Sequence, residues 1–158
     1  MGRSARLAAA VPLVVLLSGC AWASRPLTPA EAAGPRLTHA ALVRKAEAAC
    51  DRRSRTLAAL PRPRTKAQVK HFFARVAAVE RAEVEALAAL RPPERDELKY
   101  ARLVAASLEL AEIAERFHVA VVRSEDHERR RALAAADRAS AAYDRAARRL
   151  GLACRQSS

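Results

Sequence analysis

The chain has 158 residues, the length of a single domain with a modest core. Alanine makes up about a quarter of them, whereas 4 are glycine and 4% are aromatic, so the composition favours close-packed helices and excludes an all-β fold. Lysine and arginine number 29 against 17 acidic residues, a net charge of +12 that in a cytoplasmic protein would suggest a nucleic-acid partner. The N-terminal residues predict a different compartment.

The first residues of the chain have the features of a secretory signal peptide. Arg3 and Arg6 precede an apolar run from Leu7 to Leu17 that only Pro12 interrupts. This run is too short for a transmembrane helix, which needs about 20 apolar residues. We therefore predict that the apolar run is an export signal and no lasting membrane span.

The apolar run ends in Leu17-Ser18-Gly19-Cys20, which resembles the bacterial lipobox. The resemblance implies that residues 1–19 are removed and that Cys20 is acylated. The alternative is an ordinary secretory signal with a cysteine near its cleavage site. Two acyl chains on Cys20 would anchor the protein stably. We therefore expect an exported lipoprotein of the cell envelope, held at the outer face of the bacterial cytoplasmic membrane.

Removal of residues 1–19 takes Arg3 and Arg6 away and leaves 27 basic against 17 acidic residues, a net charge of +10. Outside the cytoplasm, the natural counter-charges are anionic lipid headgroups and acidic wall polymers. We therefore expect the membrane itself, an envelope protein or an anionic lipid or wall polymer as partner, and no nucleic acid.

Residues 20–37 are expected to form the lipidated cysteine and a flexible tether. They contain Pro26, Pro29, Gly34 and Pro35 and no apolar period. Such a segment is semi-extended and would hold the domain away from the bilayer, at roughly 3 Å per residue. Residues 38–158 form the predicted folded domain.

The first half of this domain predicts two amphipathic helices. The first begins at Thr38 as N-cap and ends near Leu60, before two prolines. Its apolar arc contains Leu42, Val43, Ala46, Ala49, Cys50, Leu57 and Leu60. The second opens at Thr65 and ends near Leu90, with an inner face of Val69, Phe72, Phe73, Val76, Val79, Val84, Leu87 and Leu90.

The second half predicts two more helices. Pro93 can be the first residue of the third helix, which runs to about Arg123. Its expected buried residues are Leu103, Val104, Leu108, Leu110, Ile113, Phe117 and Val121. Ser124 is the expected N-cap of the fourth helix, which has a mostly alanine inner face and a left-handed C-terminal cap at Gly151. Short connections make neighbouring helices antiparallel, so we predict an all-α, up-down-up-down four-helix bundle.

Once Cys20 is lipidated, Cys50 and Cys154 remain as an even pair in an oxidising compartment, which is most simply a disulfide. In the predicted bundle, the first and last helices are neighbours, so the tail after Gly151 passes along the first helix. Two unpaired thiols are the alternative.

The overall layout resembles small Ala- and Arg-rich helical lipoproteins of GC-rich bacteria. The elements that carry the resemblance are the lipobox, the proline-containing tether, the cysteine pair and three short segments: Leu60-Pro61-Arg62-Pro63-Arg64, Leu90-Arg91-Pro92-Pro93 and Leu150-Gly151-Leu152-Ala153-Cys154. The resemblance implies the helical fold and the envelope location and leaves the function open.

Three charged residues fall on apolar arcs of the first two helices: Arg53, Glu80 and Glu83. Because buried charges normally pair, we predict an ion pair that fixes the register of these helices. Side chains at the edge of the core that reach water are the alternative. The run of Arg129, Arg130 and Arg131 is expected to lie on a solvated face.

The strongest metal-binding pattern is Glu115-Arg116-Phe117-His118, because Glu-x-x-His places two ligands on one helical face. The pattern occurs once, so Glu115 and His118 remain weak candidates, and the favoured interpretation is a half-buried histidine beside a solvated glutamate. We expect no cofactor and no catalytic activity, since no complete catalytic motif is found.

Two functions follow from these patterns. The favoured one is a non-catalytic envelope lipoprotein, a binding or structural module for a partner protein or an anionic surface. The alternative is a small-molecule or metal carrier or sensor that uses the bundle interior around His118, Tyr100 and the inward glutamates.

Overall fold

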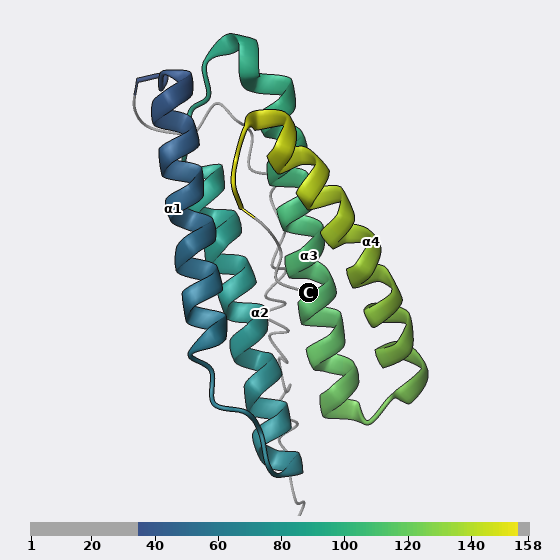
Figure 1. The fold of residues 1–158 in the computed structure, drawn as a ribbon. Helices are drawn as coiled ribbons and strands as arrows, with labels where there is room; N and C mark the ends of the chain where they lie inside the picture. The colour runs from purple at the N-terminus through teal and green to yellow at the C-terminus, as the bar shows by residue number, and fades with distance from the viewer. Residues whose placement is uncertain (1–34, 155–158) are drawn as a thin grey trace, which may run out of the picture.

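The computed structural model describes residues 35–154, which form four long helices joined by short connections (Figure 1). The helices are α1 (His39–Ala58), α2 (Lys66–Ala88), α3 (Glu97–Arg123) and α4 (Asp126–Leu150), and a 3-10 turn, η2 (Glu94–Asp96), precedes α3. Each connection reverses the chain direction, so residues 35–154 form the predicted up-down-up-down bundle and contain no strand. The predicted signal peptide, Cys20 and the tether up to residue 34 lie outside the described residues.

The first two helices begin at the predicted caps. The Thr38 hydroxyl accepts a hydrogen bond from the Ala41 backbone N–H. Thr65 forms a capping box with Gln68, in which each side chain bonds to the other residue's backbone N–H. Each of these two helices ends about two residues before its predicted end, at Ala58 and at Ala88, and a proline follows within four residues of each end.

The prediction that Ser124 is the N-cap of α4 is wrong. Ser124 is the C-cap of α3 in the left-handed conformation, with φ 61°, and its N–H bonds to carbonyls of the last turn of that helix. An N-cap needs an extended backbone, whereas a left-handed residue reverses the chain within this short connection. The N-cap of α4 is Glu125, which makes no side-chain capping bond.

The start of α3 also differs from the prediction. Pro93 has an extended backbone and precedes η2, so that α3 begins at Glu97. The Asp96 side chain is buried at the end of η2, and its Oδ2 lies 2.8 Å from His39 Nδ1 of α1. This contact ties the turn to the first helix.

The helices pack mainly in chain order, α1 against α2, α2 against α3 and α3 against α4. The core consists largely of leucines and alanines, with Tyr100 and Tyr143 as its largest side chains. The predicted neighbours α1 and α4 make little direct contact. The Tyr143 hydroxyl of α4 and the C-terminal tail contact α1 instead, through Cys50 and Glu47.

The C-terminal tail closes the bundle. Gly151 has φ 78° and ends α4 as predicted, and Leu152 is buried. The Ala153 N–H donates to Glu47 Oε1 of α1 at 3.0 Å, and Cys154 is bonded to Cys50 with their Cα atoms 5.8 Å apart. The predicted disulfide is therefore present, and Figure 1 shows the tail that carries it, leaving α4 and returning along α1.

The described chain enters the bundle at the α2–α3 connection. The Leu37 N–H donates to the Arg91 carbonyl at 2.9 Å, and Arg36 bonds to the Pro92 carbonyl at 3.2 Å and pairs with Glu97. Ordered packing thus begins within the segment predicted to be tether. This entry point lies at the end of the bundle opposite the α1–α2 connection (Figure 1).

One predicted core residue of α3 is not buried. The Leu108 side chain is 47% exposed, because the helix packs on α2 and α4 and leaves its remaining surface to solvent. Val104 and Phe117, which are also expected to be buried, are only half-buried.

Candidate functional site

The predicted ion pair between α1 and α2 is present in the core. Arg53 Nε and Nη2 donate to the two Glu80 oxygens at 2.7 and 2.5 Å, and Nε lies 3.3 Å from Glu83 Oε2. The three side chains are 10%, 7% and 1% exposed. Burial opposes the charge on Arg53, but its hydrogen bond to Glu80 and the charges of both glutamates raise its pKa overall. This bidentate pair joins α1 to α2 inside the core.

Glu83 extends this cluster to the other two helices. Its Oε1 accepts the Tyr143 hydroxyl of α4 at 2.8 Å, and Ser107 of α3 lies at 3.5 Å from Oε2. Burial raises the pKa of Glu83, and the Arg53 charge and the two hydroxyls offset this only in part. Burial, together with the Glu83 charge, also raises the pKa of Tyr143.

Tyr143 connects the cluster to the disulfide. Its hydroxyl oxygen lies 3.0 Å from Cys50 Sγ. Because a disulfide sulfur carries no hydrogen, the hydroxyl is the only donor here, and the Glu83 carboxylate is the stronger acceptor. The buried polar cluster of Arg53, Glu80, Glu83, Ser107 and Tyr143 therefore joins all four helices beside the disulfide. Because the cluster is buried away from solvent, its arrangement is suited to stabilising the bundle.

The weak metal candidates do not form a site with each other. Glu115 is half exposed, and its Oε2 lies 3.3 Å from Arg81 Nη2 of α2. His118 is half-buried, and its Nδ1 atom is buried without a hydrogen-bond partner. Residues 35–154 contain no group of three or more His, Cys, Asp or Glu side chains that could hold a metal ion.

The residues of the carrier alternative are also far apart. The Tyr100 hydroxyl donates to the Leu87 carbonyl at 2.6 Å, and burial raises the pKa of this hydroxyl. Tyr100 and His118 are separated by 18 residues of one helix, about 27 Å. The inward glutamates are already held by Arg53.

The surface around the α1–α2 connection is strongly basic. No acidic residue occurs between Asp51 and Glu80, and this segment holds eight of the ten net positive charges of the predicted mature chain. Arg53 is paired in the core. The other seven cations are exposed, and none forms an ion pair within residues 35–154: Arg52, Arg55, Arg62, Arg64, Lys66, Lys70 and Arg75. We call these seven residues the basic end.

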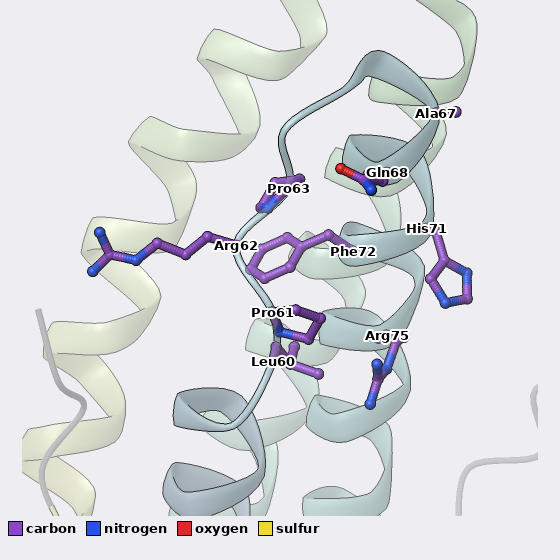
Figure 2. Close-up of a pocket in the computed structure, with 9 residues that line it drawn as sticks. All are labelled: Leu60, Pro61, Arg62, Pro63, Ala67, Gln68, His71, Phe72 and Arg75. Carbon is purple, nitrogen blue, oxygen red and sulfur yellow. The ribbon is translucent and has the colours of Figure 1, made fainter.

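A pocket of about 520 Å³ lies under the α1–α2 connection (Figure 2). The Phe72 ring lies beside Pro61 and Pro63, and the Arg62 side chain points away from this ring. Gln68, His71 and Arg75 line the part formed by α2. The volume falls within the range of ligand-binding pockets, about 300–1,000 Å³.

All three phenylalanines of the chain lie in one row at this end of the bundle. The rings of Phe72 and Phe73 are 5.2 Å apart and nearly perpendicular, and those of Phe73 and Phe117 are 4.6 Å apart. All three are only half-buried. The phenylalanine row thus places aromatic surface next to the basic end.

A second hollow of about 380 Å³ lies on the far side of the row, among α2, α3 and α4. Its apolar lining residues are Val69, Phe73, Phe117, Val121 and Leu133. Its polar lining residues are Asp126, Arg129 and Arg130, of which the first two pair with each other. We call it the three-helix hollow.

Neither the basic end nor the phenylalanine row was predicted from the sequence. The net charge of the whole chain conceals the local signal for the basic end, which is a 28-residue stretch without an acidic residue. The row could not be found from one helix, because Phe117 comes from α3 and the other two rings from α2.

Comparison with protein-family models, curated proteins and solved structures found no match. Among residues 35–154, no helix is both long and apolar enough to cross a membrane.

Proposed function

We propose that this chain is a non-catalytic, lipid-anchored protein of the bacterial cell envelope that binds an anionic surface through its basic end. The observation that carries the proposal is the gathering of seven exposed cations, without ion pairs among the described residues, at one end of the bundle. Lipid headgroups and acidic wall polymers offer the same chemistry, closely spaced negative charges.

Export is supported by three features of the chain. The N-terminal apolar run and the Leu17-Ser18-Gly19-Cys20 sequence are typical of a lipoprotein signal. The Cys50–Cys154 disulfide is typical of an oxidising compartment. In such a compartment an anionic envelope component is the expected counter-charge for the basic end.

The strength of this binding can be estimated from the charges. A lysine or arginine near an anionic membrane surface contributes about 1 kcal/mol. Because these cations are exposed, salt should screen them, over a Debye length of about 8 Å at physiological ionic strength. Binding should therefore weaken steeply between low and physiological salt.

The first experiment tests the surface. The mature chain, residues 20–158 with Cys20→Ser to exclude the anchor, is sedimented with vesicles of anionic or neutral phospholipid and with acidic wall fragments. We expect binding to at least one anionic surface and none to neutral vesicles. The triple variant Arg62→Gln, Arg64→Gln, Lys70→Gln should lose about 100-fold in affinity, the equivalent of about 3 kcal/mol.

The matched control removes three cations from the opposite half of the bundle: Arg44→Gln, Lys99→Gln and Arg102→Gln. Both variants have the same net charge, so a loss confined to the first locates binding at the basic end. Equal losses in the two variants, or no binding to any anionic surface, would contradict the proposal.

A second experiment tests the anchor. Mass analysis of the membrane fraction should find acylated Cys20 as the first residue, and the full-length Cys20→Ser chain should not be acylated. A Cys20→Ser protein that stays as firmly bound in high salt as the wild type would show that the anchor lies elsewhere.

A further inference from the structure

We infer that the anionic surface is a phospholipid bilayer, and that the phenylalanine row and the three-helix hollow enter its interfacial region beside the basic end. This inference rests on the proposed function. It adds which of the two anionic surfaces is bound and which residues contact the hydrocarbon.

Large apolar side chains lie partly exposed at this end of the bundle. With only three phenylalanines available, burial of all three in the core would be the most stabilising arrangement. They instead lie half-buried at one end of the bundle. Leu133, which lines the three-helix hollow, is 55% exposed, and Val122 in the last turn of α3 is 44% exposed.

Apolar and cationic groups occur together on this surface. A soluble polyanion can be bound by cations alone, and contact with it does not remove apolar side chains from water. A bilayer offers anionic headgroups above hydrocarbon, so it matches a surface of aromatic and aliphatic side chains bordered by arginine and lysine. At the three-helix hollow Arg129 is engaged by Asp126, while Arg130 makes no ion pair within residues 35–154.

The predicted anchor is close enough along the chain to share a bilayer with the basic end. The described chain begins at the α2–α3 end, opposite the basic end. Pro35 lies fifteen positions after Cys20, and this stretch of chain can span at most about 50 Å. The longest helix, α3, has 27 residues and is about 40 Å long. The anchor and the basic end can therefore contact the same bilayer.

The experiment uses the mature chain with Cys20→Ser and compares Leu133→Gln with Leu98→Gln. Leu98 is 67% exposed near the α2–α3 connection, so its variant removes the same apolar group at the other end. Neither substitution touches the core. We expect Leu133→Gln to weaken binding to anionic vesicles about fivefold to tenfold and to leave binding to a soluble polyphosphate unchanged. Leu98→Gln should bind like the parent chain in both assays.

A spectroscopic measurement tests insertion directly. The chain has one tryptophan, Trp22, so Trp22→Phe combined with Phe73→Trp places the only indole in the phenylalanine row. Lipids with brominated acyl chains should quench this indole on binding, and soluble polyphosphate should not.

The outcomes separate this inference from the proposed function. If the triple basic-end variant loses vesicle binding but Leu133→Gln binds normally and the indole introduced by Phe73→Trp is not quenched, the function stands and the bilayer inference fails. Stronger binding to wall fragments than to vesicles, or a dimer in sedimentation that Leu133→Gln dissociates, would assign the apolar surface to a wall polymer or to a second copy and overturn the inference. If the parent chain bound no anionic surface at all, the proposed function itself would be wrong.

Discussion

Arg53 holds two buried carboxylates at once and is therefore the residue on which the core depends most. Its partners Glu80 and Glu83 have almost no contact with water. Removing one member of a buried ion pair leaves charge without compensation, which costs about 3–5 kcal/mol.

We predict that Arg53→Met lowers the free energy of unfolding at pH 7 by about 3–5 kcal/mol. Burial and the Glu80 charge raise the pKa of Glu83 in the folded state, and without the Arg53 cation the charge that offsets this rise is lost. A carboxyl group whose pKa is raised on folding stabilises the folded state below its unfolded pKa and loses this contribution as pH rises. The loss of stability caused by Arg53→Met should therefore be smaller at pH 4 than at pH 7. Urea unfolding at both pH values measures this. Arg52→Met, an exposed neighbour, should change stability by at most about 0.5 kcal/mol. An Arg53→Met deficit that is the same at pH 4 and pH 7 would argue against the mechanism.

A substitution of Glu83 should change stability with pH in the opposite direction to Arg53→Met. Its raised pKa means that the folded state loses stability as pH rises from the unfolded value of 4.5 through the folded one. Glu83→Gln keeps an acceptor for the Tyr143 hydroxyl but does not ionise. We therefore expect its stability relative to the wild type to increase between pH 4 and pH 7. Glu85→Gln on the exposed face of α2 is the control, and a decrease for Glu83→Gln over this range would contradict the cited pKa direction.

At the scale of the helices, α3 and α4 each end at a residue with a left-handed backbone, which is a serine in α3 and a glycine in α4. Gly151 adopts φ 78° without steric cost, whereas Ser124 adopts φ 61° with a side chain. Space around Gly151 is open, since a Cβ atom there would have no neighbour within 4 Å. Any effect of a side chain at this position therefore comes from the backbone conformation alone.

We predict that Ser124→Gly raises the free energy of unfolding by about 0.5–1 kcal/mol, and that Gly151→Ala lowers it by about 1 kcal/mol. Thermal unfolding followed by circular dichroism measures both. Ser140→Gly within α4 is the matched control and should destabilise by about 0.5–1 kcal/mol, because the backbone there is helical. Destabilisation by Ser124→Gly would show that its side chain contributes more than the strain that it imposes.

At the scale of the whole molecule, the C-terminal tail and its disulfide close the side of the bundle where α1 and α4 do not pack directly. The bond joins residues 104 positions apart. By the chain-entropy model, a loop of this size contributes about 4–5 kcal/mol. The tail also places Leu152 in the core and donates a hydrogen bond from the Ala153 N–H to Glu47.

We predict that Cys154→Ala lowers the free energy of unfolding by roughly 4 kcal/mol in the mature chain with Cys20→Ser. This substitution leaves Cys50 in the core and so avoids a cavity there. Reductant should destabilise the parent chain by a similar amount and leave the Cys154→Ala variant unchanged. Equal stability of parent and variant without reductant would show that the disulfide contributes nothing to the stability of the fold.

Much of the fold could be predicted from the sequence because its causes are local. The Thr38 and Thr65 caps, the glycine that ends α4 and the prolines that separate the first helices act within a few residues. The Arg53 ion pair was also predictable, because charges that fall on apolar arcs of adjacent helices normally pair when they are buried. The role of Ser124 could not be predicted, because a serine suits an N-cap and only the three-dimensional turn requires a left-handed residue there.

The sequence by itself determined four amphipathic helices in antiparallel order, the cysteine pair and the charged residues that face the core. These follow from helical periodicity, capping and the cost of burying an unpaired charge. Only the tertiary structure decided that Tyr143 and the tail connect α4 to α1, that Glu83 joins all four helices, and that three phenylalanines meet beside the seven cations of the basic end. Each of these depends on contacts between residues far apart in the chain, and the packing of whole helices sets such contacts, which no local pattern encodes.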